Sequence, residues 1–384
     1  MRKYHQLLLI IISVFSLTLL LVYRHEYNRL RYVLEVFNFF GQPCNFSELI
    51  TSGNILNHHD WGPDPVWTQE DSVFVFSSHL TSQQQLQSLV VKSPKSGHAK
   101  NCYLWFDDNE WKPKVGKLRY QNLFTNNSYE GYYYICEWTE AATPYAVSYS
   151  KKQLVKNIIV QNNDISNKFK MTMCVPPTKF LTKRFLSEFL SYHNLVGVDS
   201  FIVYSNALPH KTVKLINNLS RQLNFNISFY SYNFPQYFEE IVVEDCRLRT
   251  LKQSNYSVLM EVNEYMTPRS GKDIFIALKS KTGMFKLPIL KFCINEQIST
   301  KPISLQNIYL VRDVEKLVKV VNVHNNDNNV PGNESGLISS NNNIQRYVFC
   351  LDALAKVYAD DTILKFSDDF IKSTLFQINL HNFL

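Results

Sequence analysis

The chain has 384 residues, of which 45% are hydrophobic and 19% are charged, and this composition excludes a disordered polypeptide. Its length is sufficient for one large domain or two smaller ones. The net charge is +7, but lysine and arginine are scattered and form no basic helix, so the sequence does not favour nucleic-acid binding. We interpret the positive surplus as a mild attraction for anions such as nucleotide-sugar phosphates, or for membrane surfaces.

The N-terminal end predicts a membrane anchor. Residues 7–23 form an uncharged, mainly apolar segment, and no small-residue cleavage site follows it. This pattern predicts an uncleaved transmembrane signal anchor, preceded by a short cytosolic tail of residues 1–6. The protein would then be a single-pass type II membrane protein with a lumenal body. The shortness of the span favours the Golgi or another membrane of the secretory pathway over the plasma membrane.

The cysteines fit an oxidising compartment. They are widely spaced and form no C-x-x-C motif, which argues against zinc and thioredoxin-like sites, so we expect up to three disulfides and one free thiol. The seven are Cys44, Cys102, Cys136, Cys174, Cys246, Cys293 and Cys350. Six acceptor sequons permit a glycoprotein without requiring one. They lie at Asn45, Asn126, Asn218, Asn226, Asn255 and Asn333.

The body divides near residue 165. Residues 24–65 mix charged and aromatic residues without a sustained period, which indicates a juxtamembrane stem. Residues 66–165 contain short β-branched and aromatic runs separated by turn residues, which predicts a small, β-rich antiparallel domain. Residues 166–384 change rhythm and form the second domain.

The second domain alternates strand and helix patterns. Short buried strands are predicted at Thr172 to Val175, Ser200 to Tyr204, Asn226 to Tyr232 and Ser257 to Val262, and helices around residues 181–193 and 236–252. This alternation predicts an α/β fold whose sheet is mostly parallel, with helices on both faces.

Three polar residues follow the last of these strands. Glu261, Asn263 and Glu264 lie where ligands of open α/β sheets bind, beyond the carboxyl ends of the strands. If the backbone stays extended, Glu261 and Asn263 point the same way and can offer oxygens to one hard cation. The alternative is that all three are ordinary solvated loop residues.

Five motifs occur in order along the second domain: Cys174-Val-Pro-Pro, the run from Glu188 through His193 and Gly197 to Asn206, Gln236 with Asp245-Cys246, Glu261-Val-Asn263-Glu264-Tyr265, and the segment from Lys301 to His324. Together they resemble the catalytic domain of glycosyltransferase family 92, formerly a domain of unknown function. The resemblance implies a type II membrane protein with a nucleotide-sugar-binding domain of the A type (GT-A). It also implies inverting transfer of galactose from UDP-galactose to a glycan of a glycoprotein or glycolipid.

The resemblance assigns roles to individual residues. Glu261 and Asn263 occupy the positions of the family's D-x-D motif, and His324 is the third candidate ligand of a Mn²⁺ or other divalent cation that stabilises the departing diphosphate. Glu264 is a candidate catalytic base. Asp245 and Arg249, four apart on a predicted helix, are candidates for binding the UDP-sugar, or else form a simple ion pair.

The sequence departs from the family at polar positions. Asn263 is neutral where the family has an aspartate, so the metal should bind weakly, and Arg346-Tyr347-Val348 stands where the family has His-Tyr-Arg. Two hypotheses therefore stand. The protein is an active glycosyltransferase with a degenerate metal site, or a catalytically silent member that binds glycans or scaffolds other proteins of the secretory pathway.

Overall fold

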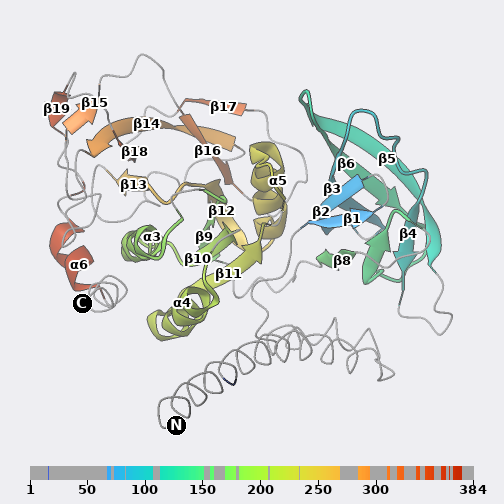
Figure 1. Cartoon of the computed structure of the whole chain (residues 1–384), viewed down its shortest axis with the longest axis horizontal. Coiled ribbons are helices and arrows are strands. Elements are labelled where there is room, and N and C mark those ends of the chain that lie inside the picture. The colour runs from blue at the N-terminus through green and yellow to red at the C-terminus, as the bar shows by residue number, and fades with distance from the viewer. Residues whose placement is uncertain are drawn as a thin grey trace, which may run out of the picture. The chain divides into compact units, whose positions relative to one another are not determined.

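The protein is described here from a computed structural model. This model describes residues 67–70, 73–82, 84–106, 113–150, 156–159, 169–178, 181–205, 208–232, 234–268, 284–294, 309–311, 318–323, 334–337, 342–349, 356–359, 363 and 366–373, together with Ser16. The described residues from Trp67 onward belong to one compact unit, residues 60–384 (Figure 1). The predicted stem lies outside these residues, as does the predicted anchor except for Ser16. No helix within the described residues is long and apolar enough to span a membrane.

The first sheet has eight strands and closes on itself. Its order is β1-β2-β3-β6-β5-β4-β7-β8, and β8 also pairs with β2. Every pairing is antiparallel except that between β2 and β8. The strands are β1 (Thr68–Glu70), β2 (Val73–Ser82), β3 (Gln85–Lys92), β4 (Cys102–Trp105), β5 (Lys114–Thr125), β6 (Glu130–Glu137), β7 (Ala146–Ser148) and β8 (Lys156–Ile159).

A disulfide crosses the interior of this sheet. It joins Cys102 on β4 to Cys136 on β6, and Gly116 of the intervening β5 lies directly against it. A Cβ atom at position 116 would come within 2.7 Å of the Cys136 Sγ and 2.9 Å of the Cys102 Sγ. Only glycine lets the two sulfur atoms pass this strand so closely.

The second sheet begins with four parallel strands. They are β9 (Phe169–Val175), β10 (Ser200–Ser205), β11 (Asn226–Ser231) and β12 (Ser254–Leu259), arranged in the order β11-β10-β9-β12. Each is connected to the next by a helix, as parallel neighbours require. The helices are α3 (Lys183–Leu195), α4 (His210–Leu223) and α5 (Glu239–Thr250).

The rest of this sheet is mixed, so the prediction of a mostly parallel sheet is wrong for the sheet as a whole. Beyond β12 several of the strand pairings are antiparallel. These strands are β13 (Glu264–Pro268), β14 (Met284–Ile294), β15 (Tyr309–Val311), β16 (Val318–Val323), β17 (Glu334–Leu337), β18 (Asn342–Phe349) and β19 (Lys356–Ala359), followed by helix α6 (Ser367–Lys372). The domain therefore has a mixed α/β fold.

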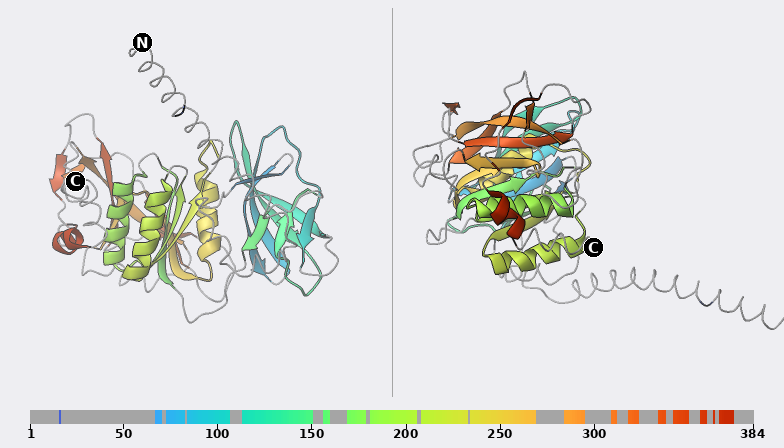
Figure 2. Two further views of the ribbon diagram at one scale, coloured as in Figure 1. Left: turned by 60° about the horizontal axis from the view of Figure 1, so that its bottom comes forward. Right: turned by 90° about the vertical axis from the view of Figure 1, so that its left-hand side faces the viewer.

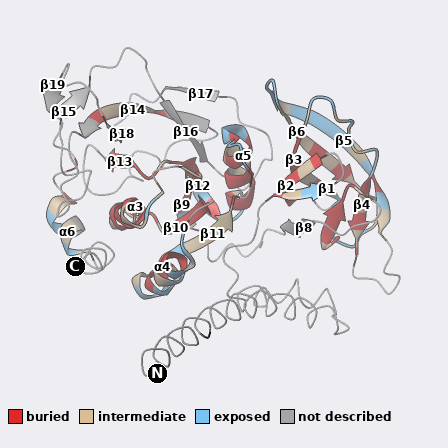
Figure 3. Cartoon of the chain, viewed as in Figure 1, coloured by how far each residue is buried: buried red, intermediate tan, exposed pale blue. Residues whose placement is uncertain are grey.

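The predicted helices on both faces are present. Alternate residues of β9 and β10 face opposite sides, because strand side chains alternate. Met173 and Phe201 pack with α3 and α4, whereas Cys174 and Ile202 pack with α5. Figure 3 shows that α3, β9 and β10 are largely buried, whereas α4 has an exposed face.

Helix α5 lies between the two sheets. One apolar cluster contains Ile241 and Cys246 of α5, Leu259 of the second sheet, and Phe76 and Leu89 of the first. In Figure 2 (left) α5, in yellow, stands between the strands of the second sheet and the blue and teal strands of the first. The two sheets thus share a core, which is built around this helix.

Helix α3 carries a buried histidine that ties it to β13. The His193 Nδ1–H donates to the Phe189 carbonyl at 2.9 Å, and Nε2 accepts from the Met266 N–H at 3.2 Å. These partners fix the neutral tautomer. Burial lowers the pKa of His193 to about 3.

We expect this histidine to make the fold sensitive to acid. Below pH 6.5 His193 takes up a proton in the unfolded chain, whereas in the folded chain it stays neutral down to about pH 3. The free energy of unfolding therefore falls as the pH falls. Between pH 6.5 and pH 5 the loss should reach roughly 2 kcal/mol, at about 1.4 kcal/mol per pH unit. Urea titrations at pH 7, 6 and 5 measure it.

The variant His193→Gln tests this assignment, because an amide can keep both hydrogen bonds without titrating. It should reduce the pH dependence of the unfolding free energy, whereas His98→Gln, at a partly exposed histidine in the loop between β3 and β4, should leave most of it. An unchanged slope in His193→Gln would assign the acid sensitivity to other groups.

Candidate functional site at the carboxyl ends of the parallel strands

The strand order reverses beside β9, and we refer to the region outside the carboxyl ends of β9 and β12 as the crevice. The chain places β10 and β11 on one side of β9 and β12 on the other, so the connections leave β9 and β12 in opposite directions. In open α/β sheets, ligands bind at such a switch point, outside the carboxyl ends of the strands. Here β9 ends at Val175 and β12 at Leu259, and the Met260 N–H bonds the Cys174 carbonyl at 2.8 Å. The residues that follow β12 therefore border the crevice.

Those residues form a tight turn. The Glu264 N–H donates to the Glu261 carbonyl at 2.9 Å, and the Glu264 carboxylate accepts from the Glu261 N–H at 2.8 Å. The strand predicted to reach Val262 thus stops at Leu259, and the extended backbone assumed between Glu261 and Asn263 is wrong. The chain turns here because β13 must return to pair with β18 instead of continuing β12.

Glu261 and Asn263 both stay at this turn. The Glu261 side chain is half-buried, and Asn263 is 7% exposed. Carboxylate and amide oxygens are hard ligands that suit a divalent cation, but two of them make only part of a coordination sphere. No group of three or more histidine, cysteine or acidic residues that could hold a metal occurs in the described part of the chain. The third predicted ligand, His324, lies outside it.

Glu264 is fully buried, and both of its oxygens are engaged. One accepts from the Glu261 N–H, and the other accepts from Nε of Arg346 at 2.8 Å and from its Nη2. In this arrangement Glu264 holds the turn in shape. To act as the predicted base it would first have to be released by Arg346.

Further charges surround the turn. Burial would lower the pKa of Arg346, but the carboxylate of Glu264 raises it above its ordinary value. Glu261 and Glu239, in the first turn of α5, act in the same direction. Burial raises the pKa of Tyr237, and Glu239 and Glu261 raise it further. Glu239, Tyr237 and Arg346 therefore belong to the environment of the crevice, although the sequence did not point to the first two.

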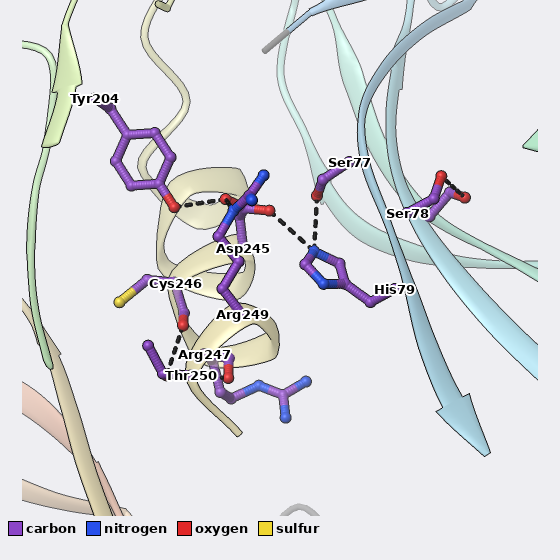
Figure 4. A network of polar contacts seen from close by, with 10 residues as sticks. Ser77, Ser78, His79, Tyr204, Asp245, Cys246, Arg247, Arg249 and Thr250 are labelled. Carbon is purple, nitrogen blue, oxygen red and sulfur yellow. Dashed lines mark hydrogen bonds and ion pairs between the residues drawn. The ribbon is translucent and has the colours of Figure 1, made fainter. Parts of the chain in front are cut away.

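The other two predicted donor-binding residues lie in a buried network. Asp245 Oδ2 accepts from the Arg249 Nε at 2.5 Å and from the Tyr204 hydroxyl at 2.5 Å, and Oδ1 lies 3.0 Å from the His79 Nε2 (Figure 4). The Arg249 guanidinium lies 4.1 Å from the centre of the Tyr230 ring. Asp245 and Arg249 therefore form the ion pair that was one of their two predicted roles, and through His79 they link α5 to the first sheet.

The protonation states in this network follow from its charges. Burial would raise the pKa of Asp245, but Arg249 and His79 outweigh it and hold the pKa below its ordinary value. Burial lowers the pKa of His79 despite the neighbouring carboxylate. A neutral His79 then donates from Nε2 to Asp245, and its buried Nδ1 has no hydrogen-bond partner among the described groups. No sequence motif pointed to His79, which lies 166 residues from Asp245.

A disulfide joins the network to the crevice. Cys174, near the end of β9, is bonded to Cys246, the neighbour of Asp245 on α5. Together with Cys102–Cys136 it makes two disulfides among the described residues. The side chains of Cys44, Cys293 and Cys350 lie outside the described part of the structure.

Comparison with known proteins supports the sequence resemblance. The family model described as glycosyltransferase family 92 matches residues 169–302, about a third of the chain. This range contains the four parallel strands, the turn after β12 and the Asp245–Arg249 ion pair. A search of curated proteins finds no match.

Two solved structures are similar to just over half of the chain. HddC from Yersinia pseudotuberculosis is 10% identical to this chain, with a TM-score of 0.25. The match covers 99% of HddC and 53% of this chain. The 4-diphosphocytidyl-2C-methyl-D-erythritolsynthase from Anaerococcus prevotii is 11% identical, also with a TM-score of 0.25. The match covers 100% of that chain and 55% of this one.

Proposed function

We propose that this protein is a glycosyltransferase of family 92 with a GT-A nucleotide-sugar-binding domain. It transfers galactose from UDP-galactose to a glycan of a glycoprotein or glycolipid, with inversion. The observation that carries the proposal is the turn from Glu261 to Glu264, which borders the switch-point crevice within the range that the family model matches. The N-terminal anchor of the sequence prediction would hold the protein in a Golgi or other secretory-pathway membrane, with its body in the lumen.

A divalent cation fits this site as a weakly held partner of the donor. Glu261 and Asn263 would hold it together with His324, and the cation would neutralise charge on the departing diphosphate. One carboxylate and two neutral ligands leave a divalent ion under-neutralised, so the diphosphate itself must supply much of the binding. The glycan hydroxyl additionally needs a base, and Glu264 qualifies only if its contact with Arg346 opens.

A catalytically silent, glycan-binding or scaffolding protein is the second candidate function. It is favoured by two features of the turn, namely the neutral Asn263 and the full engagement of Glu264. Release of UDP from UDP-galactose in the presence of Mn²⁺ and a glycan acceptor distinguishes the two, because a scaffold releases none.

The donor site can be tested through metal binding. Titration calorimetry with Mn²⁺ should show weak binding without UDP and clearly tighter binding with it, since the diphosphate completes the negative charge. Asn263→Asp should tighten Mn²⁺ binding by restoring a second carboxylate. Glu261→Ala should weaken both Mn²⁺ and UDP binding about tenfold or more, because it removes one charged ligand of the cation.

Glu140→Ala provides the control, because Glu140 is a partly exposed glutamate of the first domain whose nearest basic partner, Lys114, is 3.9 Å away. It should change neither affinity. If Glu261→Ala and Asn263→Asp behave like this control, the turn does not form the donor site and the silent candidate becomes the better one.

A further inference from the structure

Arg346 reaches the candidate donor site from a distant part of the chain. It lies on β18, directly opposite Glu264 on β13, and the two positions are 82 residues apart in sequence. A single oxygen of the Glu264 carboxylate accepts from both Nε and Nη2. Arg346 is therefore fixed at the turn that carries Glu261 and Asn263.

This contact uses only part of the guanidinium. An arginine has five N–H donors in a planar fork, and Glu264 takes two of them. None of the other residues that the structure describes accepts a hydrogen bond from Arg346, and 21% of its side chain remains exposed. Three of the five donors are therefore not used by any described residue, while the contact with Glu264 restricts the orientation of the fork.

Because position 263 has no carboxylate, the positive charge of Arg346 can compensate for a weakly bound metal ion at this turn. A neutral Asn263 weakens the hold of the turn on a divalent ion, so less positive charge is available to a diphosphate. Arginine carries a permanent charge, and its fork matches the oxygens of a phosphate. A preoriented arginine at the same turn would supply positive charge without depending on metal affinity.

We propose that Arg346 binds the diphosphate of the nucleotide-sugar donor and that Glu264 positions it for this contact. The inference rests on the proposed function, because it adds a residue to the same donor site. It gives Glu264 a positioning role, and the catalytic base would then be another group.

The test compares UDP with uridine, which lacks the diphosphate. On the full-length protein, Arg346→Met should weaken UDP binding about tenfold or more, the loss typical of a charge-assisted hydrogen bond, and should leave uridine binding unchanged. Arg346→Lys should have a UDP affinity between those of the wild type and Arg346→Met, because lysine keeps the charge and lacks the planar fork. Arg119→Met is the matched control, since Arg119 is also paired with a glutamate, Glu137, but belongs to the first sheet. It should affect neither ligand.

The outcomes separate this inference from the proposed function. Equal losses for UDP and uridine would show that Arg346 only maintains the turn, and unchanged UDP binding in Arg346→Met would likewise overturn its role while leaving the donor site intact. A wild-type protein that binds neither ligand would overturn the proposed function together with this inference. Should Arg346→Met fail to fold, a selective loss of UDP binding in Arg346→Lys would support the inference, and its absence would refute it.

Discussion

Replacing Asp245 with alanine should lower the free energy of unfolding by about 3–5 kcal/mol, because it removes one member of a buried ion pair. Asp245 is fully buried, and its carboxylate holds Arg249, Tyr204 and His79 at once. Without it, the cation of Arg249 stays in the core with no counter-ion, and the two other groups lose a charged partner. The effect should exceed that of removing any surface ion pair.

Urea unfolding at pH 7 measures the effect, and the same helix provides the control. Glu244 pairs with Arg247 near the surface of α5, where the two side chains are 20% and 28% exposed. Glu244→Ala should cost less than about 1 kcal/mol, as partly exposed pairs do. The double variant Asp245→Leu/Arg249→Leu removes both charges and should recover much of the loss. Equal costs for Asp245→Ala and Glu244→Ala would show that the buried network adds no stability.

The sequence predicted those parts of the fold that depend on local pattern. The strands that contain Cys174 and Ile202, and the helices α3 and α5, could be placed because apolar residues recur at the period of each element, whereas α4 was not predicted. The four-residue spacing of Asp245 and Arg249 likewise indicated an ion pair, which the structure contains. The mixed character of the second sheet could not be foreseen, since strands beyond β12 pair with partners far away in sequence.

The candidate site was only partly predictable for the same reason. Glu261, Asn263 and Glu264 were correctly placed at a strand end, because a short apolar run precedes them. Their turn was missed, since nothing in E-V-N-E distinguishes a turn held by a buried carboxylate from an extended strand. The partner that neutralises this carboxylate, Arg346, lies on β18, and no local signal connects the two residues.

Removing the Cys174–Cys246 disulfide should also have a large effect, and on two properties. The bond closes a chain segment 72 residues long, for which the loop-entropy relation gives about 4 kcal/mol of stabilisation. The Cys174 carbonyl also accepts a hydrogen bond from the Met260 N–H, next to the turn of the candidate donor site. The variant Cys174→Ala/Cys246→Ala should therefore lose stability and bind UDP more weakly, because β9 and α5 are no longer joined beside the crevice.

The second disulfide allows these two effects to be separated. Cys102–Cys136 closes 34 residues within the first sheet, so the same relation gives a similar stabilisation of about 4 kcal/mol. Cys102→Ala/Cys136→Ala should thus match the other pair in urea unfolding but retain the UDP affinity of the wild type. If both double variants lose UDP affinity to the same extent, the loss follows from general destabilisation. If only Cys174→Ala/Cys246→Ala loses it, the disulfide on β9 shapes the donor site directly.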